Sequence, residues 1–458
     1  MTADIVLKIN QANSENDFET ALRLCGDALE NDPQNASFLI GKGNALFGLK
    51  RAEEAVSAYL AAAQADETDS LPWANLAGVY YDMRRLDDGL AACAEALKRD
   101  GANVNALIHR GNLFMLKEDF AAALAAYNAA EKITPEDTLV LFNKANALSE
   151  LDRPDEAEEI YAELARKNPA DEDVLYALAS VLEKAEKFAP AARAYLRLLQ
   201  IRETPVLHIT LGGCLYNMLL KEQDIFPILD DWLNAFPTNP VALHTLKTAD
   251  RLNPAKRAAA DYVSELFDAF ADSFDSVLKG LDYQAPALIA EKAAEIVSNR
   301  PSVLDLGCGT GLCGVELCKR LKPACLTGVD LSDGMLVKAR ERNLYTELVQ
   351  ADITVFSRET AFDAVVSADV LTYLGDLSAV FENVKKSLKT GGYFVFTVSE
   401  NTEHLDLYEM ELSGRFKHGE NYIRKTLTGF EIAALSRVEL RKELNEPVMG
   451  LLVAARKI

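Results

Sequence analysis

The first half of the chain is built on a repeat of 34 residues, which limits the possible folds more than any other feature of the sequence. In windows of 34 residues that start at Thr2, small residues recur at the eighth, twentieth and twenty-seventh positions, and tyrosine is frequent at the twenty-fourth. The twentieth position reads Ala21, Ala55, Gly89, Ala123, Ala157, Ala191 and Ile225. Small residues let two helices approach closely, so each window predicts one pair of packed helices.

Proline near the end of several windows supports this interpretation. Four of the seven windows carry it at the thirty-second position, where it would stop the second helix and set the turn into the next pair: Pro33, Pro135, Pro169 and Pro237. The register is predicted to hold without a slip through seven windows, residues 2–239, and the segment at 240–253 is expected to be a capping helix. The pattern resembles the tetratricopeptide repeat, whose helix pairs stack into an all-α solenoid with a concave groove.

Asparagines recur on the first helix of the expected pairs. They stand at the sixth and ninth positions of the windows and are Asn44, Asn75, Asn112, Asn143 and Asn146. An asparagine amide both donates and accepts hydrogen bonds, so a ladder of amides is predicted to bind the backbone of an extended peptide in the groove. The alternative is that asparagine is simply common at these positions of the repeat family.

Charge and hydropathy restrict the partners. Residues 1–250 carry a net charge of −17 and residues 251–458 a net charge of −5. An acidic surface repels phosphate, so a basic protein or peptide is the expected partner and nucleic acid is not, although a merely solvated surface is the alternative. No apolar run is long enough to span a bilayer and the N-terminus lacks a signal pattern, so we expect a cytoplasmic protein with no membrane partner.

The seven cysteines are expected to be free thiols, because their number is odd and no signal segment precedes them. Four of them lie close together in the sequence: Cys308, Cys313, Cys318 and Cys325. Their spacing differs from the short paired spacing of zinc sites, so no metal site is expected.

The second half of the chain follows a different pattern. Apolar segments at 302–306, 325–330, 346–350, 362–368 and 392–398 alternate with amphipathic segments, which predicts an α/β domain with a parallel, doubly wound sheet. Residues 430–458 contain two long strand-like segments around a polar turn and predict an antiparallel hairpin at the sheet edge. The chain is therefore divided into a repeat domain at 2–253 and an α/β domain at 254–458.

The stretch VLDLGCGTG, residues 303–311, predicts a ligand-binding loop. It joins the first expected strand to a helix, and its glycines would let the backbone approach a ligand at the carboxyl edge of the sheet. Asp330 follows the second strand, where a carboxylate can accept hydrogen bonds from both hydroxyls of a ribose. Asp352 follows the third strand, near the place expected for an adenine amine.

These segments, in this order and spacing, resemble the class I S-adenosylmethionine-dependent methyltransferases, a Rossmann-like family, over residues 262–458. The order of repeats and then this domain resembles bacterial predicted methyltransferases with tetratricopeptide repeats. The resemblance implies S-adenosylmethionine as the cofactor and a lid at 267–286 that includes Phe270. The other residues that it places around the cofactor are Asp305, Gly307, Cys308, Gly309, Gly311, Asp330, Leu331, Met335, Asp352, Ile353 and Asp369.

No fixed catalytic residue is expected, because methyl transfer needs alignment of the nucleophile more than proton transfer. The candidates for contact with the methyl acceptor are Tyr373, Arg415, His418 and Tyr422, with His418 as a possible base. We consider a methyltransferase for a protein held by the solenoid first. The alternatives are a small-molecule methyltransferase whose repeats serve assembly, and a non-catalytic scaffold. The sequence does not fix the acceptor atom.

Overall fold

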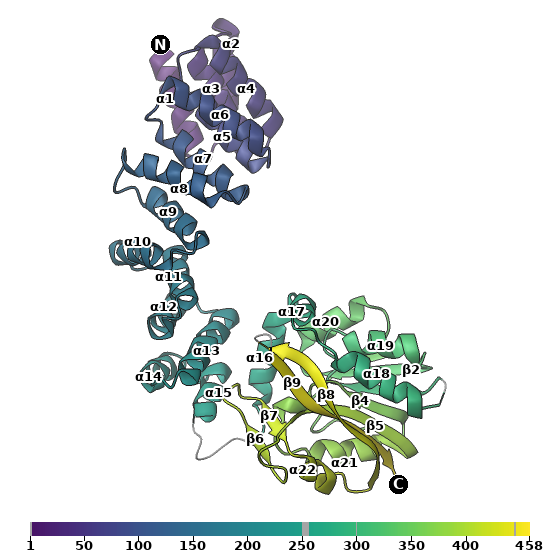
Figure 1. Ribbon diagram of the computed structural model, residues 1–458. Helices are drawn as coiled ribbons and strands as arrows, with labels where there is room; N and C mark the ends of the chain where they lie inside the picture. The colour runs from purple at the N-terminus through teal and green to yellow at the C-terminus, as the bar shows by residue number, and fades with distance from the viewer. Residues whose placement is uncertain (1, 250–255, 299, 444–445) are drawn as a thin grey trace. The chain divides into compact units, whose positions relative to one another are not determined.

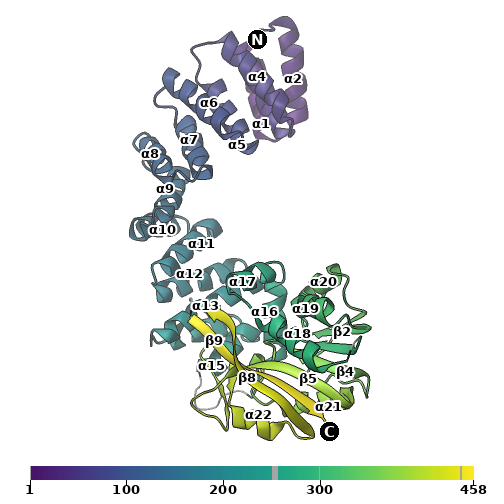
Figure 2. The ribbon, with the colours of Figure 1, turned by 45° about the vertical axis from the view of Figure 1, so that its right-hand side comes forward.

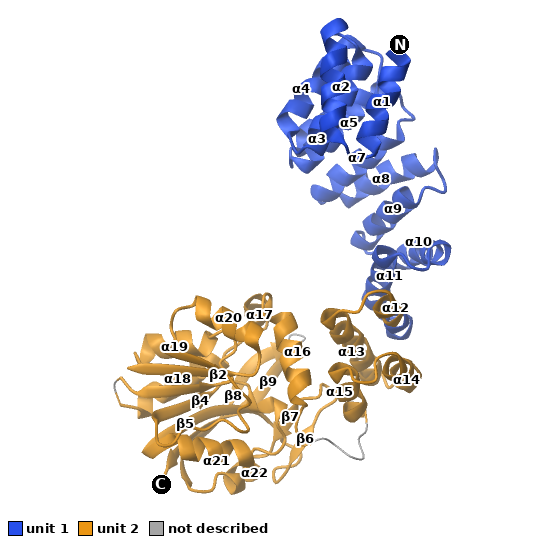
Figure 3. Ribbon diagram, turned by 180° about the vertical axis from the view of Figure 1, so that it is seen from behind, with its two compact units in different colours: residues 1–194 blue, residues 195–458 orange. Residues whose placement is uncertain are grey.

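The computed structural model describes residues 2–249, 256–298, 300–443 and 446–458. The chain forms two compact units, Met1–Ala194 and Tyr195–Ile458, which Figure 3 shows in blue and orange. Their boundary lies inside helix α12, Phe188–Ile201. The boundary predicted between residues 253 and 254 lies outside the described residues. The last helices of the repeat region thus belong to the same compact unit as the sheet.

The first unit is a series of antiparallel helix pairs, which correspond to the first six predicted windows (Figure 1). The pairs are α1 (Thr2–Ser14) with α2 (Phe18–Asn31), α3 (Ala36–Gly48) with α4 (Ala52–Ala65), α5 (Leu71–Asp82) with α6 (Leu86–Arg99), α7 (Val104–Leu116) with α8 (Phe120–Glu131), α9 (Thr138–Glu150) with α10 (Pro154–Lys167), and α11 (Glu172–Lys184) with α12. Asparagine or aspartate caps several of these helices; Asn103 and Asp171, for example, accept from backbone N–H groups of the first turn.

The turn inside each pair repeats with the same period as the sequence. A residue with positive φ ends the first helix of six successive pairs, and these residues are 34 apart: Asn16, Lys50, Arg84, Glu118, Asp152 and Glu186. In the seventh pair the equivalent residue is Glu222, two positions late, because α13 (Pro205–Leu220) has 16 residues where α11 has 13. The expectation of seven windows without a slip is therefore wrong for the last window.

Close packing explains the small residues of the repeat. A side chain on Gly43 would overlap the ring of Tyr59, and one on Gly111 would overlap the ring of Tyr127. In these two pairs the tyrosine of the second helix therefore fills the space that glycine leaves on the first helix. This arrangement confirms the packing role that the sequence pattern predicts for the eighth and twenty-fourth positions.

The second unit begins with the last helices of the repeat region: α13, α14 (Phe226–Ala235) and α15 (Pro240–Ala249). The last of these corresponds to the predicted capping helix, of which residues 250–253 lie outside the described part. Helices α16 (Ala260–Phe270) and α17 (Phe274–Gly280) follow, and α16 packs against α13 and α15 (Figure 1).

A nine-stranded sheet forms the centre of this unit. Strands β1 (Ser302–Leu306), β2 (Cys325–Asp330), β3 (Glu347–Gln350), β4 (Phe362–Ser367) and β5 (Leu388–Glu400) run parallel in the order β3-β2-β1-β4-β5. The hairpin of β8 (Phe430–Glu443) and β9 (Glu446–Lys457) joins β5 through antiparallel β9. Strands β6 (Tyr408–Met410) and β7 (Phe416–His418) extend the sheet at the end of β5. The predicted doubly wound sheet with a terminal hairpin is confirmed.

Helices cover both faces of the sheet, as Figure 2 shows for α18 (Ala285–Ile296) and α21 (Ser378–Ser387). Alternate residues of β1 serve the two faces. Val303 belongs to a core shared with α18 and α19 (Leu312–Arg320), whereas Leu304 belongs to a core shared with α21 and α22 (Glu420–Thr426). Helix α20 (Asp333–Glu341) packs against β2 and β3. In the described part of the chain, no helix is long and apolar enough to cross a membrane.

Candidate active site

The glycine loop lies where β1 ends and α19 begins. Gly307, Gly309 and Gly311 have φ values of +70°, +53° and +92°, which favour glycine over other residues. A side chain on Gly307 would overlap Val370, and one on Gly311 would come within 3.0 Å of Arg342. Gly309 differs from both, because a Cβ there would meet only Phe274, at 3.9 Å. The loop therefore faces open space at Gly309.

That open space belongs to a pocket at the carboxyl edge of the sheet, here called the main pocket. Its walls come from the glycine loop, from the ends of β2 and β4, from the loop after β3 and from α16 and α17. The residues used below that line it are Arg257, Phe267, Phe274, Gly307, Cys308, Gly309, Asp330, Leu331, Met335, Asp352, Ile353, Asp369, Tyr373, Arg415 and Arg441.

Asp330 stands at the end of β2 and lines the main pocket. Its carboxylate accepts hydrogen bonds from the backbone N–H groups of Gly309, at 2.8 Å, and Ser332, at 3.0 Å. These bonds tie the glycine loop to the second strand and leave lone pairs of the carboxylate for a ligand. Burial raises the pKa of Asp330 above its ordinary value. Met335, on α20, is 1% exposed and lines the same wall.

Asp352 and Ile353 follow β3 and also line the main pocket. Asp352 accepts bonds from the backbone and hydroxyl of Thr354, at 2.8 and 2.7 Å, and forms an ion pair with Arg257 at 3.0 Å. Although burial opposes the change, these partners lower the pKa of Asp352. A fixed carboxylate at this edge is suited to bind an amine or a ring edge of a nucleoside.

The predicted lid covers the main pocket, but with other aromatic residues than expected. Phe267 and Phe274 line the pocket and contact each other edge to face at 5.8 Å. Phe270, which the resemblance places at the cofactor, is 41% exposed and outside the pocket lining. Phe267 and Phe274 are seven residues apart, which is close to two helical turns. The chain bends between α16 and α17, and both rings line the main pocket.

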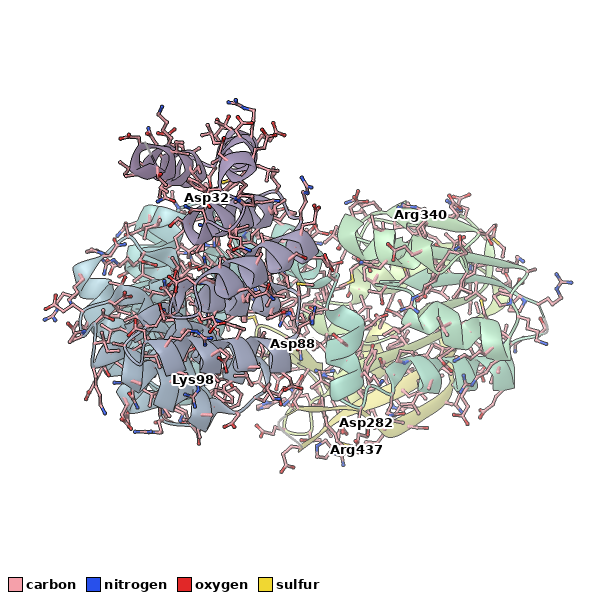
Figure 4. All side chains as sticks on the ribbon, turned by 90° about the horizontal axis from the view of Figure 1, so that it is seen from above. Asp32, Asp88, Lys98, Asp282, Arg340 and Arg437 are labelled. Atoms are coloured by element: carbon pink, nitrogen blue, oxygen red, sulfur yellow. The ribbon has the colours of Figure 1, made fainter. Side chains whose placement is uncertain are left out.

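The last part of the lid is anchored on the terminal hairpin. Gln284 N–H donates to the carbonyl of Leu440 at 2.8 Å, and Lys442 N–H donates to the carbonyl of Leu281 at 2.7 Å. Lys442 also pairs with Asp282 at 3.0 Å; Figure 4 labels Asp282 beside this hairpin. The hairpin thus fixes one end of the lid.

Asp305 lies beneath the glycine loop rather than in the pocket wall. It is fully buried, and Tyr345 donates to its Oδ2 at 2.7 Å. Among the described residues its Oδ1 has no hydrogen-bond partner, and burial raises the pKa of Asp305 to about 7. Cys308, in contrast, is 4% exposed and lines the main pocket. Asp305 therefore supports the loop from below and does not line the space in front of it.

A charged network forms the side of the main pocket near β8. Asp369 has a φ of +56° and pairs with Arg441 at 2.5 Å. Arg441 and Arg415 both donate to Oε1 of Glu443, at 2.8 and 2.6 Å. Burial raises the pKa of Asp369, and among the described residues its Oδ1 lacks a partner. This oxygen is therefore a buried acceptor without a partner among the described residues, on a residue that lines the main pocket.

Two of the four acceptor candidates lie at the pocket and two do not. Tyr373 and Arg415 line it. His418 is 0% exposed in β7, with its Nε2 bonded to the carbonyl of Gly375 at 3.1 Å, and burial lowers its pKa to about 4. The Tyr422 hydroxyl donates to the same carbonyl at 3.2 Å and accepts from the Leu377 N–H at 2.9 Å. His418 and Tyr422 therefore stabilise the β6–β7 region and lie outside the main pocket.

A second cavity adjoins the main pocket. Its volume is about 430 Å³, and it shares Leu281, Tyr373 and Arg415 with the main pocket. One wall comes from the last helices of the repeat region, through α13 and α15, and the opposite wall comes from α16, from residues 412–415 and from Glu443. His244 of α15 stacks on Tyr262 of α16 at 3.8 Å and fixes this wall.

The asparagines of the predicted peptide groove are already engaged within the repeats. Asn44 accepts a hydrogen bond from Tyr59 at 2.6 Å, Asn112 from Tyr127 at 2.7 Å and Asn146 from Tyr161 at 2.5 Å. Asn75 donates to Asn44 at 3.1 Å, and Asn143 is half-buried on α9. The side-chain carbonyl of Asn44 accepts from both Tyr59 and Asn75, so its two-sided pairing with a peptide backbone is restricted to its N–H groups, whereas those of Asn112 and Asn146 each keep one lone pair beside the bond from tyrosine.

Sequence reasoning missed five of the residues described above: Arg257, Phe267, Phe274, Arg441 and Glu443. Phe267 and Phe274 carry a signal in their seven-residue spacing. Arg441 and Glu443 carry no distinct signal, since charged and apolar residues are mixed along β8 and only Phe430, Leu440 and Arg441 in it are buried. Among the described residues no group of three or more histidine, cysteine, aspartate or glutamate side chains is arranged to hold a metal ion.

Family models match both parts of the chain. A model described as a methyltransferase domain matches residues 303–392. Tetratricopeptide-repeat models match residues 14–70 and 75–138, and a further one matches residues 114–181. The first match contains the glycine loop, Asp330, Asp352 and Asp369, and the others lie within the helix pairs of the first unit.

Individual relatives cover only parts of the chain. The malonyl-[acyl-carrier protein] O-methyltransferase of Priestia megaterium is 29% identical over 160 residues, which are 34% of this chain and 55% of the relative. The chain thus spans about half the length of this curated relative. A solved S-adenosylmethionine-dependent methyltransferase from Mesorhizobium loti is 22% identical, with a TM-score of 0.31, and 38% of this chain covers 97% of it.

A solved repeat protein is similar to the repeat part of this chain. YrrB, described as a tetratricopeptide-repeat protein with an unusual peptide-binding site, is 19% identical with a TM-score of 0.35, and 42% of this chain covers 99% of it. The family models and the residues of the main pocket support S-adenosylmethionine as the cofactor. The chain carries tetratricopeptide repeats followed by a domain of the methyltransferase family.

Proposed function

We propose that this chain is an S-adenosylmethionine-dependent methyltransferase whose acceptor belongs to a protein or peptide partner held by the repeat solenoid. The observation that carries the proposal is the second cavity, which joins the main pocket and has the last repeat helices as one wall. An acceptor that reaches the methyl group from this side passes the repeats. The net charge of −17 over residues 1–250 favours a basic partner. The free cysteines agree with the cytoplasmic location that we propose.

The chain's own residues would bind and orient the reactants. When bound, S-adenosylmethionine supplies a methyl group on a positively charged sulfur, which is already a good leaving group. Asp330 would accept hydrogen bonds from the ribose, and Asp352 would bind the adenine edge. The free Oδ1 of Asp369 would pair with the ammonium group of the methionine part. Phe267 and Phe274 exclude water from the site, so alignment and dehydration would supply most of the rate enhancement.

The experiment is transfer of labelled methyl groups from S-adenosylmethionine to a cell lysate by the purified full-length protein. We expect label in the protein fraction. The Asp330→Ala variant is the control, because it should abolish the transfer while the repeats stay intact. Label confined to the small-molecule fraction would contradict a protein acceptor.

A small-molecule acceptor is the second candidate, and one observation favours it. The second cavity of about 430 Å³ is large enough to enclose a whole metabolite. In this alternative the repeats serve assembly with other proteins. The Priestia relative is named for an intermediate kind of acceptor, a small malonyl group carried on a protein. The fractionation of label described above separates free metabolites from protein-bound acceptors.

A further inference from the structure

Arg415 occupies the junction between the two cavities. It lies between β6 and β7, and it lines the main pocket and the second cavity together with Leu281 and Tyr373. Its side chain is 33% exposed, so the guanidinium is partly desolvated yet open to a ligand. A cation in this position stands where the main pocket meets the cavity from which the proposed acceptor enters.

The partners of Arg415 hold it in place without saturating it. Its Nη1 donates to Oε1 of Glu443, and the same oxygen accepts from Nε of Arg441. One carboxylate oxygen therefore serves two guanidinium groups, while the second anion of the network, Asp369, is paired with Arg441 on the cofactor side. A guanidinium offers five N–H donors in a planar fork, which suits the two oxygens of a carboxylate.

Among the described residues, no histidine that lines the two cavities is suited to act as a base for a protonated acceptor. The only histidine that lines either cavity is His244. Burial lowers its pKa to about 4, and its Nε2 abuts Gly414, on which a side chain would overlap it. His418 is fully buried outside both cavities. An amine or a hydroxyl acceptor would arrive protonated and need a base near neutral pH, whereas a carboxylate arrives ionised.

From this geometry we infer that the methyl acceptor is a carboxylate, bound by Arg415 at the junction of the two cavities. The inference rests on the proposed methyl transfer and names the chemical class of its acceptor. A lone pair on one carboxylate oxygen forms the new C–O bond as the bond between the methyl carbon and sulfur breaks. The electron pair of the broken bond stays on sulfur, so the products are a methyl ester and a neutral thioether. No proton moves in this step.

The decisive experiment is the stability of the product toward alkali. Full-length protein transfers labelled methyl groups from S-adenosylmethionine to the lysate, and the labelled product is then treated with mild base. A methyl ester releases its label as volatile methanol, whereas a methyl group on nitrogen or carbon keeps it. We expect most of the label to become volatile. Label that stays bound after base would overturn the carboxylate acceptor and leave the proposed methyltransferase function standing.

Failure of the proposed methyltransferase function can be distinguished from failure of the carboxylate inference. If the folded protein binds S-adenosylmethionine but transfers no label to any fraction, the proposed function fails and the acceptor inference fails with it. Base-labile transfer supports both proposals. The cofactor affinity is measured separately by calorimetry, so that loss of the cofactor and loss of the acceptor are not confused.

Variants of Arg415 test the residue itself. Arg415→Gln removes the charge at similar size, and we expect it to lower kcat/KM for the acceptor roughly 10- to 100-fold with cofactor affinity nearly unchanged. Arg415→Lys should retain part of the activity, because it keeps the charge without the planar fork. Arg424→Gln is the matched control, since Arg424 pairs with Glu420 on the exposed side of α22 and lies outside both cavities.

Unchanged kcat/KM for base-labile methylation in both Arg415→Gln and Arg415→Lys would overturn the assignment of Arg415. If Arg415→Gln does not fold, Arg415→Lys decides alone, because it keeps the ion pair with Glu443. Thermal unfolding of each variant distinguishes a loss of structure from a loss of acceptor binding.

Discussion

At the scale of single residues, Asp330 combines two roles in one carboxylate. It holds the glycine loop through the N–H of Gly309 and faces the main pocket. We expect Asp330→Ala to weaken S-adenosylmethionine binding about a hundredfold or more, since two charge-assisted hydrogen bonds contribute about 1.5–3 kcal/mol each. Calorimetry measures the change. Asp333→Ala, an exposed change three residues away, is the control and should bind normally. Wild-type affinity in Asp330→Ala would contradict the placement of the ribose at Asp330.

Two glycines of the loop differ in what they touch, and this difference gives a second prediction. In Gly309→Val the branched side chain would occupy the open space of the main pocket and strain a φ of +53°. We expect loss of cofactor binding with a folded protein. Gly307→Val would instead overlap Val370 and destabilise the fold. Calorimetry and thermal unfolding separate the two effects. Normal binding by Gly309→Val would mean that no ligand approaches the loop there.

Buried histidines of the second unit predict a loss of stability in acid: burial lowers the pKa of His208 as well as those of His418 and His244. Burial lowers the pKa of both His418 and His244 to about 4, whereas an unfolded histidine titrates near 6.5. Because the folded pKa is depressed, the unfolded state takes up protons between these values. The stabilisation is therefore fully present above about pH 6.5 and is lost as the pH falls toward 4. For His418 we expect about 2 kcal/mol of the free energy of unfolding to be lost between pH 7 and pH 5.

Urea unfolding at the two pH values tests this expectation. The chain has two tryptophans, Trp73 in the first unit and Trp232 in the second. A Trp73→Phe background lets Trp232 report on the second unit, which contains His418 and His244. In this background His418→Asn should lose less free energy of unfolding between pH 7 and pH 5 than the parent does. An equal loss in both would show that the charge of His418 does not govern the acid transition.

At the scale of elements, the sequence predicts the features that local periodicity determines, which are the ends of the buried strands and the pairing of the helices. The strands at Ser302–Leu306 and Cys325–Asp330 begin and end as predicted, because each is a buried apolar run between turn signals. The helix pairs follow from the 34-residue period. The extra length of α13 could not be predicted from the small-residue positions, since those positions fix how helices pack and not where a helix ends.

The orientation of side chains within an element was less predictable. Phe267, Phe270 and Phe274 all lie at helical spacing, and the bend after α16 decides which of them reaches the main pocket. The polar segment around His418 predicts a role in catalysis for this histidine. It belongs, however, to a short strand in which Phe416 and His418 share the buried face. A period of two over three residues is too short to identify such a strand from the sequence.

The charged network near β8 shows a similar limit for contacts between distant parts of the sequence. Asp369 and Arg441 are 72 residues apart in the sequence, and their pairing depends on the position of the hairpin next to β5. The sequence predicts the hairpin itself. The register of β9 on β5, however, determines which residues of β8 reach the pocket. Arg441 and Glu443 therefore became visible as site residues only in the folded unit.

At the scale of the whole molecule, the described lining of the main pocket begins at Arg257, whereas the lining of the second cavity includes helices α13 and α15 of the repeat region. Cofactor binding and acceptor binding should therefore depend differently on the repeats. A fragment of residues 203–458 keeps α13–α15 together with the sheet, and a fragment of residues 254–458 removes them. Both fragments retain every residue that lines the main pocket, so we expect both to bind S-adenosylmethionine with near full-length affinity.

The acceptor kinetics of the two fragments separate two contributions of the repeats. If the first six helix pairs recruit the partner, fragment 203–458 should have a strongly raised KM and a nearly unchanged kcat, because tethering raises the local concentration of the acceptor to about millimolar. Fragment 254–458 loses a wall of the second cavity, so its kcat should fall as well.

Equal kcat/KM in the full chain and fragment 203–458 would refute recruitment. Equal kcat in the two fragments would refute a role of α13 and α15 in holding the acceptor. If fragment 254–458 does not fold, Tyr216→Ala in the full chain replaces it, since Tyr216 lines the second cavity from α13 and lies outside the lining of the main pocket.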